Sequence, residues 1–265
     1  MFYDRNPIAL ADAVHMIPAL AAAPHASRSE RYAHVPTIAV LKALETEGFQ
    51  IYGLNNTRVR DQSRHGHQKH MVRLRRPEHA QAEQSPEVIL INSHDGSSSY
   101  RLLSGVFRFV CSNGLIVGDK WANIRIQHTG RDIISDVIEG TYSVVETFDK
   151  IADNIHAMKA ITLQPAEQEA YATAAVGLRY DDGKAPVQAA AFLRPRRPAD
   201  IGNDLWTTFN RVQENMIKGG LRGVTRDEHG RQKRATTRAV NGIDGDVKLN
   251  QALFTLAEHM AKLKA

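Results

Sequence analysis

The chain has 265 residues, of which 42% are hydrophobic and 24% charged, a composition typical of a soluble globular protein that can bury a sizeable core. A net charge of +5 and a pI near 9.3 favour an anionic partner such as nucleic acid. The single cysteine, Cys111, excludes an internal disulfide and fits a reducing cytoplasm. No apolar run approaches the roughly 20 residues of a membrane span, so we expect a cytoplasmic protein without a membrane anchor.

The first part of the chain predicts helices. Ile8 to Ala23 is apolar, but Asp12 and His15 interrupt it, so we interpret residues 1–34 as a helical arm and expect no export. Thr37 is then a plausible N-cap of a helix that ends at Gly48.

The middle of the chain predicts an antiparallel β-meander. Apolar runs are separated by two Asx-Gly pairs, Asp95-Gly96 and Asn113-Gly114, which favour tight turns. We expect strands at Gln50 to Arg60, His70 to Arg76, Val88 to Ile91, Tyr100 to Val110, Leu115 to Val117 and Ile124 to His128.

A long amphipathic helix is expected after the sheet. Apolar residues recur at helical spacing from Ile134 to Met158, and Gln164-Pro165 stops the pattern after Leu163. A helix of about 30 residues is about 45 Å long. That length exceeds what a small core needs, so the stripe predicts contact with another copy of the chain and hence a homo-oligomer.

The C-terminal part reads as helical. Asp181 to Asp200 resembles a hinge, Asp204 caps a helix that ends at Gly219-Gly220, and Arg222 to Arg238 reads as a mobile loop. On the capped helix, Asn210, Gln213 and Asn215 are candidate polar binding groups, and an equally good interpretation is that Asn210 and Glu214 occupy its solvent-exposed face. The overall prediction is an α+β fold in which helices flank the meander, with a helical arm at 1–34, a core at 35–180, and a linker with a helical portion at 181–265.

Basic residues form three clusters that could contact phosphates. Arg73 and Arg75 alternate along one predicted strand and should therefore share a face. Solvated surface charge is an equally good explanation for any single cluster, but three of them favour a nucleic-acid partner. The other clusters are Arg194, Arg196 and Arg197, and Arg222, Arg226, Arg231, Lys233, Arg234 and Arg238. The residues that we expect to bind nucleic acid are Arg58, Arg60, Arg64, Lys69, Arg73, Arg75, Arg76 and Arg108, with Tyr52, Tyr100, Phe107 and Phe109 available to stack on bases.

Histidines offer an alternative chemistry. His70, His94, Asp95 and His128 come from sheet segments that could converge on zinc or manganese, as in a metal-dependent phosphodiesterase. Their spacing matches no metal motif, and a structural role for His94-Asp95 in a tight turn is the more ordinary interpretation. Cys111 follows an apolar run and is expected to be a buried, inert thiol.

Several short motifs are spread over most of the chain. They include Val35-Pro36-Thr37, Lys69-His70-Met71, Asn92-Ser93-His94-Asp95-Gly96, Cys111-Ser112-Asn113-Gly114-Leu115, Asn210-Arg211-Val212-Gln213-Glu214-Asn215 and Gly219-Gly220-Leu221. In these motifs the chain resembles the phage and plasmid-borne proteins of the domain-of-unknown-function family number 932. The resemblance implies a mobile-element origin and a bacterial cytoplasm, and it implies no activity.

The leading functional hypothesis is a non-enzymatic protein that binds or anneals single-stranded DNA during recombination, without a cofactor. It rests on the basic clusters and on the order helix, meander, long helix, which single-strand annealing proteins share. The alternatives are the metal-dependent nuclease and a protein-interaction factor that acts against a host defence system.

Overall fold

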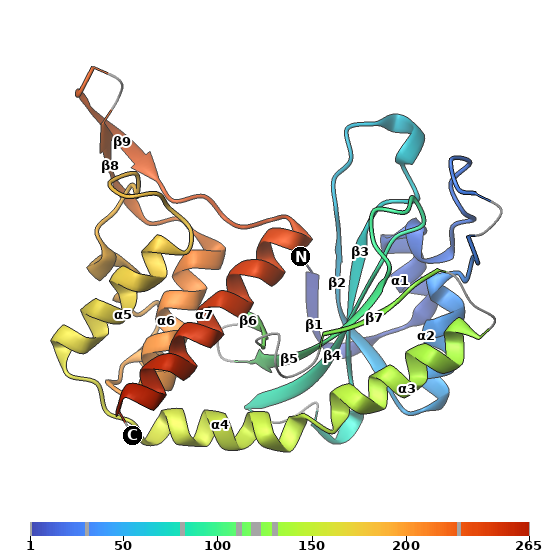
Figure 1. Ribbon diagram of the computed structural model, residues 1–265, viewed down its shortest axis with the longest axis horizontal. Helices are drawn as coiled ribbons and strands as arrows, with labels where there is room; N and C mark the ends of the chain where they lie inside the picture. The colour runs from blue at the N-terminus through green and yellow to red at the C-terminus, as the bar shows by residue number, and fades with distance from the viewer. Residues whose placement is uncertain are drawn as a thin grey trace. The chain divides into compact units, whose positions relative to one another are not determined.

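The computed structural model describes residues 2–29, 32–79, 83–109, 113–117, 123–128, 132–226 and 229–264. The chain divides into two compact units, Met1–Phe148 and Asp149–Ala265, which Figure 1 shows in blue to green and in yellow to red. The division falls at Phe148, whereas the sequence suggested divisions after residues 34 and 180. Each unit is described separately below.

The first unit is built on one antiparallel sheet, which confirms the predicted meander and the α+β class. Six strands follow one another in the order β1-β2-β3-β4-β5-β6, and β7 pairs with β5. The strands are β1 (Phe2–Ile8), β2 (Gln50–Asn56), β3 (His70–Arg75), β4 (Gln84–Asn92), β5 (Tyr100–Arg108), β6 (Asn113–Ile116) and β7 (Asn123–Ile126).

Three local predictions in this unit were wrong. Residues Phe2–Ile8 form an edge strand rather than part of a helical arm; the strand is polar and mostly exposed, so its sequence lacks an alternating pattern. Strand β2 ends at Asn56, which leaves Arg58 and Arg60 outside the sheet. Asn113-Gly114 is the start of β6, paired with Arg108 and Phe107, and not a turn.

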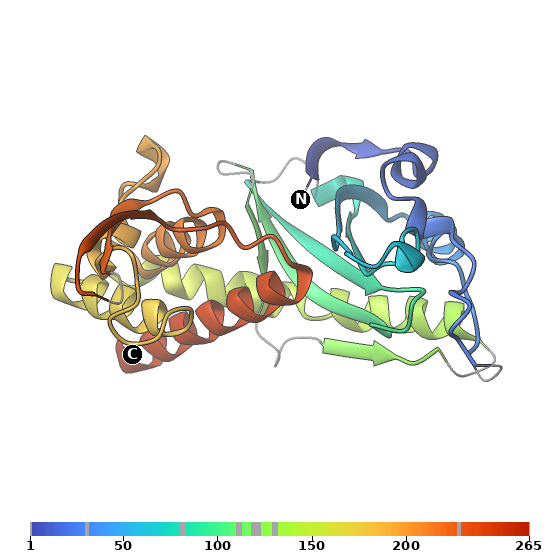
Figure 2. The same ribbon diagram turned by 90° about the horizontal axis from the view of Figure 1, so that it is seen from above.

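Helices cover one face of this sheet. They are α1 (Leu10–Met16), the 3-10 turn η1 (Pro18–Ala21), α2 (Thr37–Thr46) and α3 (Ile133–Val145). Alternate strand residues such as Val72 and Leu74 on β3 point into this core, where they meet Leu44 of α2 and Val137 of α3. Figure 2 shows α3 running beside the long strands β4 and β5.

The predicted 30-residue helix is two helices. A turn at Glu146 and Thr147 separates α3 from α4 (Phe148–Ala160). Thr147 donates its hydroxyl to Val144 O at 2.7 Å and also lies 2.8 Å from the hydroxyl of Ser104 on β5, so its side chain competes with helical hydrogen bonding. Val145, which belongs to the apolar stripe from Ile134 to Met158, packs on the core of its own unit. The stripe is therefore no longer an argument for a homo-oligomer. The homo-oligomer itself stays a prediction.

The second unit is mainly helical. It contains α4, α5 (Pro165–Gly177), α6 (Leu205–Lys218), α7 (Ile243–Lys264), the 3-10 turns η4 (Ala189–Leu193) and η5 (Pro198–Asp200), and a two-stranded ribbon of β8 (Arg222–Arg226) and β9 (Gln232–Thr236). As predicted, Asp204 caps α6, accepting from Thr207 N at 2.8 Å. The predicted hinge is instead packed structure, since Phe192 within it is fully buried, and the predicted mobile loop is the ribbon.

Within the described residues, no helix combines the length and the apolar character that crossing a bilayer requires.

The packing of α3 on the sheet gives a first prediction. Gly140 of α3 lies so close to β5 that a Cβ there would be 2.7 Å from Leu102 Cδ1. We expect Gly140→Leu to lower the free energy of unfolding by about 1–3 kcal/mol through overpacking, measured by urea denaturation. Gly177→Leu is the control, because it also replaces a helical glycine by leucine, at the last residue of α5, and nothing lies within 4 Å of the new Cβ. Equal stability of the two variants would contradict this packing.

Candidate functional site

The face of the sheet opposite these helices holds a buried ionic cluster. Arg73 and Arg75 of β3 do share a face, but each is only 1% exposed, and both contact Glu87 of β4, which is 0% exposed. Arg73 Nη1 donates to Glu87 Oε2 and Arg75 Nε donates to Glu87 Oε1, each at 2.7 Å. The expectation that this pair forms a solvent-facing phosphate strip was therefore wrong.

Aromatic rings enclose the rest of Arg75. Its Cζ lies 4.0 Å from the ring centroid of Phe107, 4.7 Å from that of Tyr52 and 5.2 Å from that of Phe109. Its two terminal nitrogens are buried and have no hydrogen-bond acceptor among the residues that the structure describes. The faces of these rings carry partial negative charge, so cation–π contacts stabilise the buried guanidinium group. Tyr52 and Phe107 are consequently buried and unavailable to stack on bases, contrary to prediction.

Gly114 of β6 is required by the same cluster. Arg73 Nη2 donates to the Gly114 carbonyl at 3.1 Å, and a Cβ at this position would be 2.6 Å from the guanidinium carbon. The Asn113-Gly114 pair that resembled a turn signal thus reflects close packing of β6 on Arg73. This guanidinium connects three strands, because it comes from β3 and contacts both Glu87 on β4 and the backbone of β6.

A network of histidines lies at the start of α2. Thr37 Oγ1 lies 2.8 Å from His70 Nε2 and 3.3 Å from His94 Nε2, and it accepts from Asn92 Nδ2 at 2.9 Å. Asn92 Oδ1 in turn lies 2.8 Å from His128 Nε2. Tyr100, another expected stacking residue, is fully buried beside this network, with its ring centroid 5.0 Å from that of His128.

Hydrogen bonding fixes the tautomers of this network. His70 Nδ1 lies 3.0 Å from the Gln68 carbonyl and must donate to it, so a neutral His70 accepts the Thr37 hydroxyl proton at Nε2. The Thr37 oxygen then accepts from His94 Nε2. That arrangement leaves His94 Nδ1 as a buried acceptor, which has no hydrogen-bond partner among the described residues.

Burial keeps these imidazoles neutral. It lowers the pKa of His70 to about 4. It lowers the pKa of His94 to about 3, and repulsion from His70 and other neighbouring histidines acts in the same direction. The pKa of His34 and that of His128 are also lowered, chiefly by burial. The network is therefore uncharged near neutral pH and cannot contribute to a phosphate-binding surface.

The proposed metal ligands are only partly brought together. The ring centroids of His70 and His94 are 5.6 Å apart, and His128 joins them through Asn92. Asp95 instead accepts from Ser97 N at 2.9 Å in its turn and lies 3.9 Å from Arg64. In the part of the chain that the structure describes, no group of three or more His, Cys, Asp or Glu side chains is arranged to hold a metal ion. Cys111 lies outside the described residues.

The remaining expected phosphate ligands differ in exposure. Arg58, Arg60 and Arg64 are exposed and lie on the loop between β2 and β3, where Arg64 is 3.6 Å from Asp61. Lys69 is half-buried on the same loop. Arg76 is half-buried with its Cζ 4.9 Å from the Phe49 ring centroid, and Arg108 is buried. The first unit therefore exposes a short basic loop and not a basic sheet face.

Polar residues of α6 are internal, which also corrects an expectation. Asn210 and Glu214 are buried instead of lying on a wet face. Glu214 accepts from Arg197 at 2.6 and 2.9 Å, and Gln213 donates to Asn250 Oδ1 on α7 at 2.6 Å. The polar run from Asn210 to Asn215 thus stabilises the second unit. It also removes Arg197 from the set of free surface cations.

The β8–β9 ribbon carries the largest set of exposed cations in the second unit. Arg222, Arg231, Lys233, Arg234 and Arg238 are exposed on it or beside it. Within the described residues, Arg222, Lys233 and Arg234 make no ion pair. The two acids of this segment, at positions 227 and 228, lie outside the described residues. Sequence reasoning found these cations but placed them on a loop.

Comparison with known proteins places the chain in a family. Residues 24–254 match the family described as "Domain of unknown function (DUF932)", and the chain belongs to it. It is similar to two Escherichia coli K12 proteins, the UPF0380 proteins YafZ and YfjQ. Each is 50% identical over 234 residues, which cover 88% of this chain and 84% of the relative. No solved structure matches.

The ionic cluster predicts a strong dependence on one carboxylate. Glu87→Gln removes the buried carboxylate to which both guanidinium groups donate, so we expect a loss of about 3 kcal/mol or more in the free energy of unfolding. Glu78→Gln removes an exposed carboxylate 3.9 Å from Arg76 and should change stability little. Chemical denaturation of both variants checks this, and similar stabilities would contradict a buried, charged Glu87.

The histidine network predicts acid sensitivity. The unfolded chain binds protons at histidines below their ordinary pKa of 6.5, while folded His70 and His94 stay neutral down to pH of about 4 and 3. Stability should therefore fall as the pH drops below 6.5, by at most about 1.4 kcal/mol per pH unit for each group. His94→Gln should reduce the slope of the unfolding free energy against pH by up to the contribution of one proton. Denaturation at several pH values measures this slope. The exposed His65→Gln is the control, and identical slopes for the two variants would exclude a neutral, buried His94.

Proposed function

We propose that the protein binds nucleic acid by contacts of the β8–β9 ribbon with backbone phosphates. The observation that carries the proposal is the set of exposed cations Arg222, Lys233 and Arg234 on this ribbon, which make no ion pair with any residue that the structure describes. Cations that neutralise phosphates release condensed counterions, and this release supplies most of the affinity in binding that does not depend on sequence. The exposed loop residues Arg58, Arg60 and Arg64 of the first unit are a second source of such contacts.

The ribbon geometry favours a duplex. In its antiparallel register, Arg222 is opposite Thr236, Val224 is opposite Arg234, and Thr225 is opposite Lys233. Opposite residues share a face and successive residues alternate, so Arg222 and Arg234 lie on one face and Lys233 on the other. A two-stranded ribbon fits the major groove of a duplex, which is about 12 Å wide. Cations on both faces suit a groove with phosphates along both walls.

The sequence analysis favoured single-stranded DNA as the partner. Binding of a single strand depends on exposed aromatic rings of the protein, on which the bases stack. Tyr52, Tyr100 and Phe107 are buried, and residues 222–238 contain no Phe, Tyr or Trp. We therefore propose a duplex as the preferred form. A mobile-element origin, a role in recombination and a cytoplasmic location stay predictions, because they rest on resemblance, element order and composition.

Salt dependence tests the proposal. Lys233→Ala with Arg234→Ala removes two ribbon cations, so the slope of log K against log salt should become shallower by about 1.8 on duplex DNA, or about 1.4 on a single strand. Fluorescence anisotropy with labelled duplex and single strand at several salt concentrations gives these slopes. The wild-type protein should bind the duplex more tightly than the single strand.

Lys150→Ala with Lys248→Ala is the matched control, because both lysines are exposed in the second unit but lie on α4 and α7. It removes the same net charge and should leave the slope unchanged. Equal slopes for the two double variants would contradict the ribbon as the contact surface. Absence of salt-sensitive binding to any nucleic acid would contradict the function itself.

A further inference from the structure

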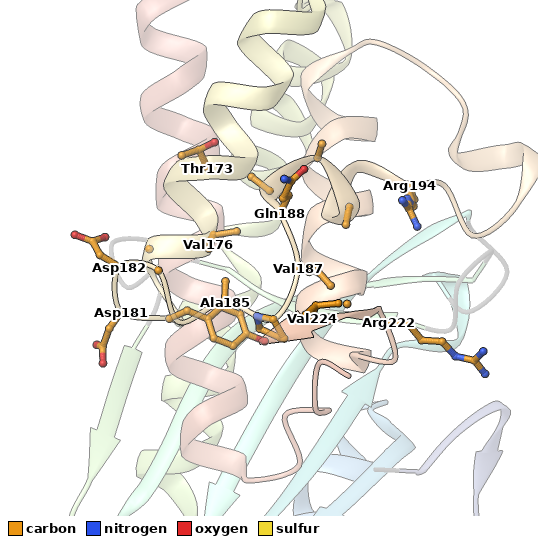
Figure 3. Close-up of a pocket in the computed structure, with 18 residues that line it drawn as sticks. Thr173, Val176, Asp181, Asp182, Ala185, Val187, Gln188, Arg194, Arg222 and Val224 are labelled. Atoms are coloured by element: carbon orange, nitrogen blue, oxygen red, sulfur yellow. The ribbon is translucent and has the colours of Figure 1, made fainter. Parts of the chain in front are cut away.

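A pocket of about 720 Å³ lies within the second unit, where the ribbon begins. Its walls come from the end of α5, from the loop at residues 181–191, from Arg194, and from the first residues of β8 (Figure 3). Its volume falls in the range of about 300–1,000 Å³ that small-molecule sites occupy. The pocket is therefore large enough to hold a ligand with several functional groups.

The lining of this pocket is divided by charge. Figure 3 shows Arg194 and Arg222 on one side of the pocket and Asp181 with Asp182 on the opposite side, where the two carboxylates point away from the other labelled side chains. Apolar residues that include Val187 lie between the two sides. Arg194 and Arg222 are exposed, and their side chains make no hydrogen bond or ion pair within the described residues. A ligand that matches this lining has an anionic end and an apolar body.

One further observation indicates a formed site. A Cβ at Gly223 would lie 1.9 Å from the Pro186 carbonyl oxygen, so the ribbon backbone packs directly against the loop. Only glycine permits this approach, which fixes two walls of the pocket relative to each other.

We propose that this pocket binds a nucleoside phosphate. Its phosphate contacts Arg194 and Arg222, and its flat base packs on Val176 and Val187. Guanidinium groups suit phosphate, because their fork of N–H donors matches the geometry of its oxygens. The inference extends the proposed function, since Arg222 belongs to both the pocket and the ribbon. Two sources carry this chemistry, a free nucleotide and the terminal nucleotide of a strand.

Isothermal titration of the full-length protein with adenosine 5′-monophosphate, adenosine and inorganic phosphate tests the pocket. We expect the nucleotide to bind at least about ten-fold more tightly than either part, because only the nucleotide contacts both the cationic and the apolar side. Arg194→Ala should weaken nucleotide binding by about ten-fold or more through the lost charged hydrogen bonds. Ala185→Trp should block binding by filling the pocket.

Lys233→Ala is the matched control, because Lys233 is a ribbon cation that does not line the pocket. Lys233→Ala should leave the affinity for the nucleotide unchanged and weaken the binding of duplex DNA. Arg194→Ala should weaken the binding of the nucleotide and leave the affinity for duplex DNA unchanged. Displacement of the nucleotide by an oligonucleotide with a 5′-phosphate, but not by its unphosphorylated form, assigns the pocket to strand ends; no displacement by either assigns it to free nucleotides. If the nucleotide does not bind, the proposal is overturned even if the ribbon binds DNA. The same holds if the Arg194→Ala and Ala185→Trp variants bind the nucleotide as tightly as the wild-type protein.

Discussion

The first unit depends on a single buried carboxylate. Glu87 accepts from two guanidinium groups on the neighbouring strand, each at 2.7 Å, in a place from which solvent is excluded. Isolated charges are not stable in such surroundings, and removing one partner of a buried ion pair costs far more than the pair contributes in water. The aromatic rings around Arg75 and the glycine beside Arg73 are arranged to accommodate this cluster. The sheet face opposite the helices is therefore a charged core and not a ligand surface.

This constraint decides where nucleic acid could bind. Arg73 and Arg75 are committed to Glu87, and Arg197 is committed to Glu214, so these cations stabilise the fold. Binding of an anionic partner must instead use cations that are exposed and not held in such pairs. Among the described residues, these include Arg58 and Arg60 on the loop after β2, and Arg222, Lys233 and Arg234 on the β8–β9 ribbon. The pocket at residues 173–194 and 222–224 places a mixed polar and apolar site beside one of these two surfaces.

Sequence patterns predicted what depends on local periodicity. The meander, the strand that begins at His70 and the cap at Asp204 follow from alternation and side-chain chemistry within a few residues. The burial of Arg73 could not be predicted in this way, because it depends on a partner from another strand, and charged residues are ordinarily exposed. Likewise, the ribbon lacks an apolar alternation, so its basic sequence resembled a loop. Of the candidate sites, sequence identified the basic segments and the neighbouring histidines, but not their environments.

The arginines that stabilise the fold are buried, whereas the arginines that are proposed to contact phosphates are exposed. Chemical modification measures this difference in exposure directly. Phenylglyoxal treatment of the native protein, read residue by residue by mass spectrometry, should modify Arg222 and Arg234 rapidly and leave Arg73 and Arg75 unmodified. Saturating duplex DNA should then protect Arg234 without altering the two buried residues. Rapid modification of Arg73 and Arg75 in the folded protein, with protection by DNA, would contradict the account, because it would show that the sheet face is exposed and binds the phosphates.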